Sequence, residues 1–119
     1  MELPPELASL DYCYLTTTGR KSGQPREIEI WFGARGSTLY LLSGGGEAAH
    51  WVRNIRAEPR VSVRVGDRTF AARGRVVEPG TDEDTRARDL LVAKYQPGYG
   101  SDLSGWRARA LPVALDLQG

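Results

Sequence analysis

The stretch "RVSVRVGDRTFAARGRVVE", residues 60–78, decides the fold. Its first six residues place a valine at every second position, which predicts a half-buried β-strand. Gly66 and Asp67 form a two-residue turn signal, and residues 68–78 then run back as a second, longer strand. Strands joined by so short a turn are antiparallel. The stretch therefore predicts an antiparallel sheet.

Other stretches also have the composition of strands. Residues 26–32 alternate apolar and acidic side chains, which predicts that Ile28 and Ile30 share one face. Residues 33–37, GARGS, are expected to form a turn. Cys13 falls among aromatic and β-branched residues and is expected to be a small core residue. The strands predicted besides the hairpin are residues 11–18, 26–32, 38–43 and 111–117.

Two stretches have helical signals. Within residues 47–58, apolar side chains recur at i, i+3, i+4 and i+7, and Pro59 ends the pattern. A second helix begins after Thr81, whose side chain is a typical N-cap, and stops near Pro97. Residues 96–106 are expected to form a long irregular loop.

The length of 119 residues is that of one ordinary domain. Short antiparallel strands joined by tight turns usually close into a small barrel, which removes exposed sheet edges. We therefore predict one domain over residues 1–119. Its class is mainly β (α+β), a six-stranded antiparallel barrel with two or three flanking helices.

Composition excludes several classes of protein. The single cysteine permits no internal disulfide, which suits a reducing compartment and predicts a cytoplasmic protein. No stretch approaches the ~20 apolar residues of a membrane span, so we expect no stable membrane insertion. A net charge of +1 argues against a nucleic-acid partner. One histidine and one cysteine make no credible metal site.

The loop at residues 19–26 concentrates positive charge. Arg20, Lys21 and Arg26 lie close together, and Ser22 adds a hydroxyl donor. Glycines let backbone N–H groups converge on one anion, so the loop is a candidate anion site. A solvated, charged hairpin tip explains the same residues equally well.

Two further candidates flank the first predicted helix. The glycine run after Ser43 leads toward a helix N-terminus, which favours anions, although it is also an ordinary connection. His50 and Asn54 lie one helical turn apart. His50 is a candidate proton donor or stacking contact, but a lone surface histidine more often has no chemical role.

Aromatic residues gather near the second helix and the loop that follows it. Tyr95, Tyr99 and Trp106 are candidates for the wall of a pocket that holds a flat ligand. They could equally be core residues.

With these residues in view, the chain resembles the deazaflavin-dependent nitroreductase and quinone reductase family, whose members use coenzyme F-420. The resemblance runs from LTTTGRKSGQPR through WVRNIRAEPRVSV to LLVAKYQPGY and LPVALDL. It implies a split β-barrel, in agreement with the barrel predicted from turns and alternation. The coenzyme carries a phosphodiester and an oligoglutamate tail, and so is strongly anionic.

The resemblance also implies roles for individual residues, in four groups. The phosphate or tail of the coenzyme would be bound by Arg20, Lys21, Ser22 and Arg26, and the approach to it would be shaped by Thr17, Thr18 and Gly19. The deazaflavin ring would lie near Ser43, Gly44 and Gly45. The helix would be packed against the barrel and the cofactor site by Trp51 and Asn54. Tyr95 and Tyr99 would lie at the substrate end.

The implied function is an oxidoreductase that passes a hydride from reduced coenzyme F-420 to a quinone, nitroaromatic or similar electron-poor acceptor. Tyr95, Tyr99 and His50 are the candidate catalytic proton donors. Flavin mononucleotide is the second choice of cofactor. The alternative is a binding module that holds a deazaflavin, flavin or tetrapyrrole without turnover. We expect a homodimer.

Overall fold

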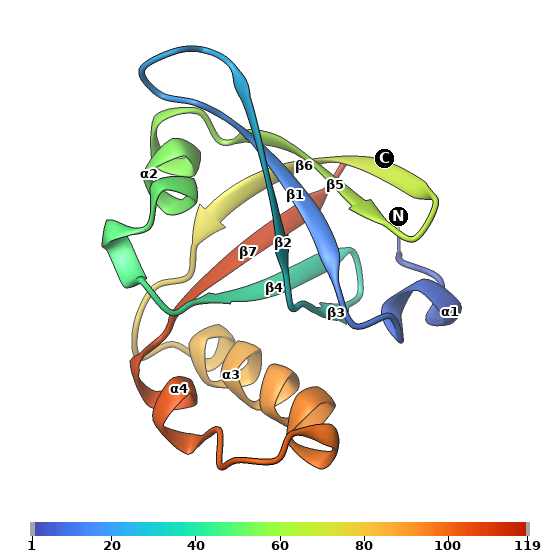
Figure 1. Cartoon of the computed structure of the whole chain (residues 1–119). Helices are drawn as coiled ribbons and strands as arrows, with labels where there is room; N and C mark the ends of the chain where they lie inside the picture. Colours follow the sequence, from blue (N-terminus) through green and yellow to red (C-terminus); the bar gives the residue numbers. More distant parts are fainter. Residues whose placement is uncertain (1, 119) are drawn as a thin grey trace.

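Figure 1 shows the computed structural model, which describes residues 2–118. Its strands form one curled antiparallel sheet of seven strands in the order β2-β1-β5-β6-β7-β4-β3. Around it lie four α-helices and two short 3-10 turns. The strands are β1 (Cys13–Thr18), β2 (Pro25–Ile30), β3 (Gly33–Arg35), β4 (Thr38–Ser43), β5 (Arg60–Val65), β6 (Arg68–Val76) and β7 (Leu111–Leu117). The antiparallel hairpin predicted from residues 60–78 is confirmed as β5 and β6.

The curl follows from the position of the two edge strands. β2 and β3 lie at opposite edges of the sheet, yet only Trp31 and Phe32 separate them along the chain. So short a link spans roughly 10 Å at most. The two edges must therefore meet at this corner. Away from the corner, β2 remains a free edge and the sheet stays open. The result is a split half-barrel.

The expectation of six strands was wrong by one. Residues 33–37 were expected to be a turn, but Gly33–Arg35 form β3 and pair with the start of β4. Three residues are too few for an alternating pattern to show in the sequence. A Cβ on Gly33 would lie 2.9 Å from side-chain carbons of Leu90, so this strand approaches α3 closely.

The helices also exceed the expected two or three. They are α1 (Pro5–Ala8), α2 (His50–Ala57), α3 (Asp82–Tyr95) and α4 (Ser104–Arg109), with 3-10 turns at Gly46–Ala48 and Gln96–Gly98. The Thr81 cap of α3 is confirmed, because its hydroxyl accepts from the N–H of Asp84 at 3.2 Å. The expected loop at residues 96–106 instead contains a 3-10 turn and the start of α4, which is too short for its period to be recognised.

Two cores occupy the two faces of the sheet. The inner core fills the curl and includes Leu15, Leu41 and Val63. The outer core lies between the sheet and α3 and includes Leu42 and Leu91. Cys13 is fully buried in the inner core, as predicted, and burial raises its pKa to about 12.

The end of α3 holds the corner where the sheet edges meet. The Lys94 ammonium donates to the carbonyls of Ala8, Leu10 and Phe32 at 3.0, 2.7 and 2.8 Å, and burial lowers its pKa to about 8. The Tyr95 hydroxyl donates to the Asp11 carbonyl at 2.6 Å and accepts from the Phe32 N–H at 3.0 Å. These contacts tie the N-terminal segment and the β2–β3 link to one helix. None of the helices within residues 2–118 is long and apolar enough to cross a membrane.

An ion-pair network joins the outer face of the sheet to the start of α3. The Arg75 guanidinium contacts Glu83 and Asp116 at 2.7 Å each, and the Tyr40 hydroxyl donates to Glu83 at 2.7 Å. The hydrogen bonds from Arg75, and secondarily that from Tyr40, lower the pKa of Glu83 from 4.5 to about 2. The network therefore stabilises the fold while Glu83 is ionised.

Arg75→Gln should remove a pH-dependent part of this stability. Because the pKa of Glu83 is lower in the folded state, its contribution is complete above pH 4.5 and is lost as the pH falls toward 2. We expect the variant to lose about 1 kcal/mol of unfolding free energy near neutral pH, since the pair is partly exposed. The difference from wild type should shrink in acid. Urea titrations at several pH values measure it, and a pH-independent difference would contradict the assignment.

Candidate functional site

The loop between β1 and β2 is a tight, glycine-dependent turn that projects from the sheet beside α2 (Figure 1). The Gly19 N–H donates to the Gln24 carbonyl, and the Gly23 N–H donates to the Gly19 carbonyl, both at 2.8 Å. A Cβ on Gly19 would lie 2.9 Å from the Ser22 hydroxyl, and Gly23 has a φ of 72°. Both positions therefore favour glycine.

Asn54 in α2 connects this loop to the sheet. Its side chain is buried, with the residue 4% exposed. Its Oδ1 accepts from the Arg20 backbone N–H at 3.2 Å and from Arg20 Nη1 at 2.9 Å. Its Nδ2 donates to the buried Thr17 hydroxyl at 3.2 Å. One amide thus holds together α2, β1 and the cationic loop.

The Arg20 guanidinium makes its contacts with the same helix, α2. Besides Asn54, its guanidinium approaches the His50 carbonyl at 3.5 Å and His50 Nδ1 at 3.2 Å. An arginine donates but cannot accept, so in this contact Nδ1 is the acceptor and the imidazole hydrogen sits on Nε2. Arg20 therefore orients the loop and the imidazole of His50, with fewer donors left for a ligand.

Lys21 and Arg26 are differently placed. Within residues 2–118, neither forms an ion pair with a carboxylate. Arg26 donates only to the Ser22 hydroxyl, at 3.3 Å. Both are exposed, so their charge is available to an anion.

These side chains line a cavity of about 440 Å³, the loop pocket. Three cations and one carboxylate border it, which leaves an excess of positive charge. Such a set of donors suits a phosphate or a chain of carboxylates. The lining residues are Thr17, Gly19, Arg20, Lys21, Ser22, Arg26, Glu27, Ile28, His50, Trp51 and Asn54.

A second cavity of about 480 Å³, the aromatic pocket, lies farther along β2. Trp31 forms its wall: one face stacks on Tyr95 at 4.1 Å between ring centroids, and Tyr99 and Trp106 meet it edge-on at 5.5 and 5.6 Å. Flat apolar walls suit a planar ring. The lining residues are Tyr12, Glu29, Ile30, Trp31, Leu42, Gly44, Tyr99, Leu103 and Trp106.

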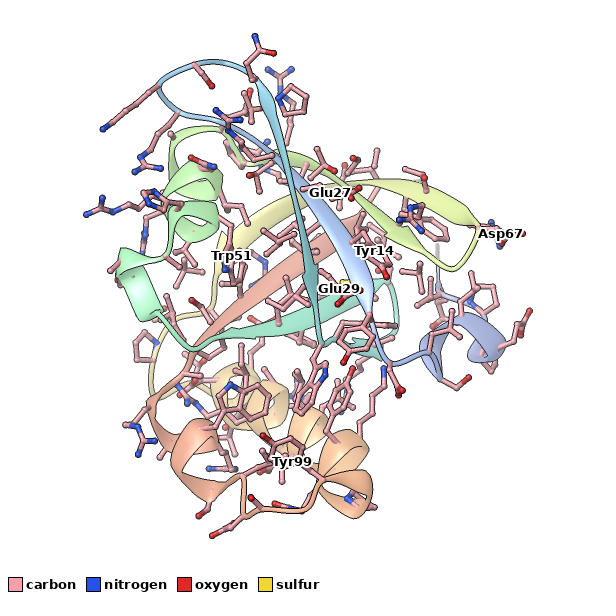
Figure 2. All side chains as sticks on the ribbon, viewed as in Figure 1. Tyr14, Glu27, Glu29, Trp51, Asp67 and Tyr99 are labelled. Atoms are coloured by element: carbon pink, nitrogen blue, oxygen red, sulfur yellow. The ribbon has the colours of Figure 1, made fainter. Side chains whose placement is uncertain are left out.

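The two pockets share the open edge strand β2. Ile28 borders the loop pocket and Ile30 borders the aromatic pocket, two positions apart on one face. That separation is about 7 Å along a strand. Figure 2 shows Trp51 between α2 and the sheet, Glu27 and Glu29 near β2, and Tyr99 beside the helices below the sheet. A long ligand with an anionic end and a planar end could therefore extend from one pocket toward the other.

Most of the residues predicted for the loop do come together. Six of them line the loop pocket, together with three predicted residues of α2, namely His50, Trp51 and Asn54. His50 therefore lies here and not beside the tyrosines. Thr18 instead borders a smaller cavity of about 280 Å³, which Pro25 and Arg60 also line. Of the glycine run, Gly44 lines the aromatic pocket, whereas the Ser43 hydroxyl is buried and donates to the Gly46 carbonyl at 3.1 Å. Gly45 borders neither pocket.

The two predicted tyrosines differ in environment. Tyr99 is 47% exposed at the rim of the aromatic pocket. Tyr95 is buried behind Trp31 with its hydroxyl bonded to backbone, and burial raises its pKa well above the usual value. Sequence analysis did not assign Trp31, Glu29 or Tyr12 to a site. The alternation of residues 26–32 places Glu29 and Trp31 on the outward face of a strand. That pattern alone does not show that the outward face borders a pocket.

The chain is similar to known proteins over most of its length. The family model described as "F420H(2)-dependent quinone reductase" matches residues 3–118. The F420H(2)-dependent quinone reductase of Mycobacterium tuberculosis is 36% identical over 105 residues, which cover 85% of this chain and 69% of that protein.

Solved structures show the same fold. A structure of an F420-H2 dependent reductase is 26% identical, with a TM-score of 0.70 over 91% of this chain and 94% of that one. Another, described as a domain-swapped dimer, is 25% identical, with a TM-score of 0.71 over 91% of this chain and 80% of that one. The chain belongs to the F420H(2)-dependent quinone reductase family, which makes it an oxidoreductase of the coenzyme F-420 class.

Asn54→Ala should detach the loop from α2. The change leaves the buried Thr17 hydroxyl and the Arg20 N–H without a partner, which costs about 1–3 kcal/mol. We expect a lower urea midpoint and faster amide hydrogen exchange in residues 19–24. Arg53→Ala is the matched control, because it changes an exposed neighbour in the same helix. Equal exchange in the two variants would refute the role of the amide.

Proposed function

We propose that this chain, as one split-barrel domain over residues 1–119, reduces an electron-poor ring with reduced coenzyme F-420. The phosphate and glutamyl tail would lie in the loop pocket, and a quinone, nitroaromatic or similar acceptor in the aromatic pocket. One observation carries the proposal: Lys21 and Arg26, unpaired within the described residues, border a cavity that shares β2 with an aromatic one.

The residues of the loop fit the anionic end of the coenzyme. Lys21 and Arg26 would supply charge-assisted hydrogen bonds, and Ser22 a hydroxyl donor. Arg20 and Asn54 would hold the loop in the binding conformation. Trp51, with Gly44 from the turn after β4, would border the space between the two pockets.

When bound, the reduced coenzyme supplies a hydride to the acceptor. A quinone that takes up a hydride also needs one proton to become a hydroquinone. Tyr99 is the best-placed donor, because it lies at the rim of the aromatic pocket and its hydroxyl makes no hydrogen bond within residues 2–118. The Tyr95 hydroxyl is already held by Asp11 and Phe32, and His50 lies in the other pocket. The apolar walls of the aromatic pocket would exclude water from the acceptor.

A homodimer is part of the proposal. The exposed side chain of Leu10, which lines neither pocket, is apolar surface that a second copy could cover. A similar solved structure is described as a domain-swapped dimer, which supports this arrangement. A cytoplasmic location, expected from the single cysteine, stays a prediction.

Lys21→Ala and Arg26→Ala should each weaken binding of coenzyme F-420 by about tenfold to a hundredfold, since a charge-assisted hydrogen bond contributes about 1.5–3 kcal/mol. The affinity of the wild type should also fall as salt is added. Fluorescence titration of the coenzyme measures both effects. Arg68→Ala, on the distant β5–β6 hairpin, is the control for loss of one positive charge. Unchanged affinity in both loop variants would exclude the loop pocket as the anion site.

Tyr99→Phe should slow turnover without weakening the binding of the coenzyme. Loss of a general acid lowers the rate by about a hundredfold or more. We expect reduced kcat for oxidation of the reduced coenzyme by menadione, with an unchanged dissociation constant for the coenzyme. If wild-type protein binds the coenzyme but menadione and a nitroaromatic cause no oxidation above background, the chain is a carrier and not an enzyme.

A further inference from the structure

Glu29 gives the aromatic pocket a charge. Of the residues that line this pocket, Glu29 is the one carboxylic acid, and no lysine, arginine or histidine lies among them. Glu29 lies on β2 directly opposite Tyr14 of β1. The Tyr14 hydroxyl donates to Glu29 Oε2 at 2.7 Å, and this contact raises the pKa of Tyr14. Tyr14 therefore holds one carboxylate oxygen, and the other has no side-chain donor among residues 2–118.

No cation within the described chain neutralises this carboxylate. Glu29 takes part in none of the ion pairs formed among residues 2–118. Arg64 lies over the Tyr14 ring at 4.2 Å and donates to the Gly66 carbonyl. Lys94 is engaged by three carbonyls behind the pocket. A negative charge thus borders the pocket uncompensated.

The walls of the pocket reinforce the same preference. Trp31, Trp106 and Tyr99 line the pocket, and the faces of aromatic rings attract cations. An aromatic wall combined with a carboxylate is a set of groups that stabilises a positively charged ring and repels a negatively charged one.

We propose that Glu29 makes the aromatic pocket select its acceptor by charge: it takes planar rings that are cationic or neutral and rejects rings that carry a sulfonate or carboxylate. This rests on the proposed function only in assigning the pocket to the acceptor. Tyr14 is a positioning residue that fixes the carboxylate. The two pockets then have opposite preferences, since the loop pocket attracts the anionic end of the coenzyme and the aromatic pocket repels anions.

The test compares three bicyclic aromatic probes of similar size, N-methylquinolinium, quinoline and naphthalenesulfonate. Their binding is followed by quenching of tryptophan fluorescence at neutral pH, without coenzyme. In the wild type we expect the cation to bind most tightly and the anion most weakly. Glu29→Gln, which keeps the shape and removes the charge, should reduce the ratio of cation to anion affinity about three- to tenfold. Added salt should shrink the ratio in the wild type, because the carboxylate is exposed.

Matched variants separate charge selection from general effects. Asp67→Asn also removes one negative charge, but it lies at the far tip of the β5–β6 hairpin (Figure 2) and should leave the ratio unchanged. Tyr14→Phe should reduce the ratio by less than Glu29→Gln does. Tyr99→Ala should weaken the binding of all three probes. Such a loss would indicate that the probes bind in the aromatic pocket. In turnover, Glu29→Gln should raise kcat/KM for a sulfonated naphthoquinone relative to menadione.

The outcomes separate this inference from the proposed function. Equal affinity for the three probes in the wild type, or the same ratio in Glu29→Gln, would overturn charge selection while leaving the acceptor pocket in place, provided that Tyr99→Ala weakens binding. Failure of all three probes to bind would overturn both charge selection and the assignment of this pocket to the acceptor.

Discussion

The side-chain amide of Asn54 is the interaction on which the loop pocket depends. It accepts twice from Arg20 and donates once to Thr17, so a single buried group satisfies three polar groups on two residues, one in the loop and one in β1. An amide can do this because it presents a donor and an acceptor at fixed geometry. Without it, the loop would keep its two backbone hydrogen bonds, the Ser22 contacts and the Arg20–His50 contacts, but it would lose its link to the buried Thr17 hydroxyl.

That dependence divides the cations of the loop into two kinds. Arg20 is bound to α2 and contributes mainly to the geometry of the pocket. Lys21 and Arg26 retain their charge for a ligand, so most of the affinity for an anion should come from them. A cluster that looks uniform in the sequence therefore combines one cation held by α2 with two that form no ion pair within residues 2–118.

The second constraint is the short link between the edge strands. Because Trp31 and Phe32 join opposite edges of the sheet, the barrel closes at one corner and stays open along the rest of β2. Both pockets lie along that opening. Lys94 and Tyr95 hold the corner from behind, and the stacking of Tyr95 on Trp31 turns the same corner into the wall of the aromatic pocket. The closure of the fold and the shape of the site thus share the same side chains.

The sequence by itself determined the elements whose signals are local. The β5–β6 hairpin, the Thr81 cap and the cationic loop each depend on neighbouring residues, and the family motifs follow from the same stretches. Only the tertiary structure decided which residues meet at the site. Arg20 and Asn54 are 34 residues apart, and Tyr95 and Phe32 are 63 apart, so no periodicity links them. β3 gains its pairing from β4, and Glu29 gains its pocket from aromatic side chains at the other end of the chain. These roles arise from contacts between distant segments, which exist only once the sheet has curled.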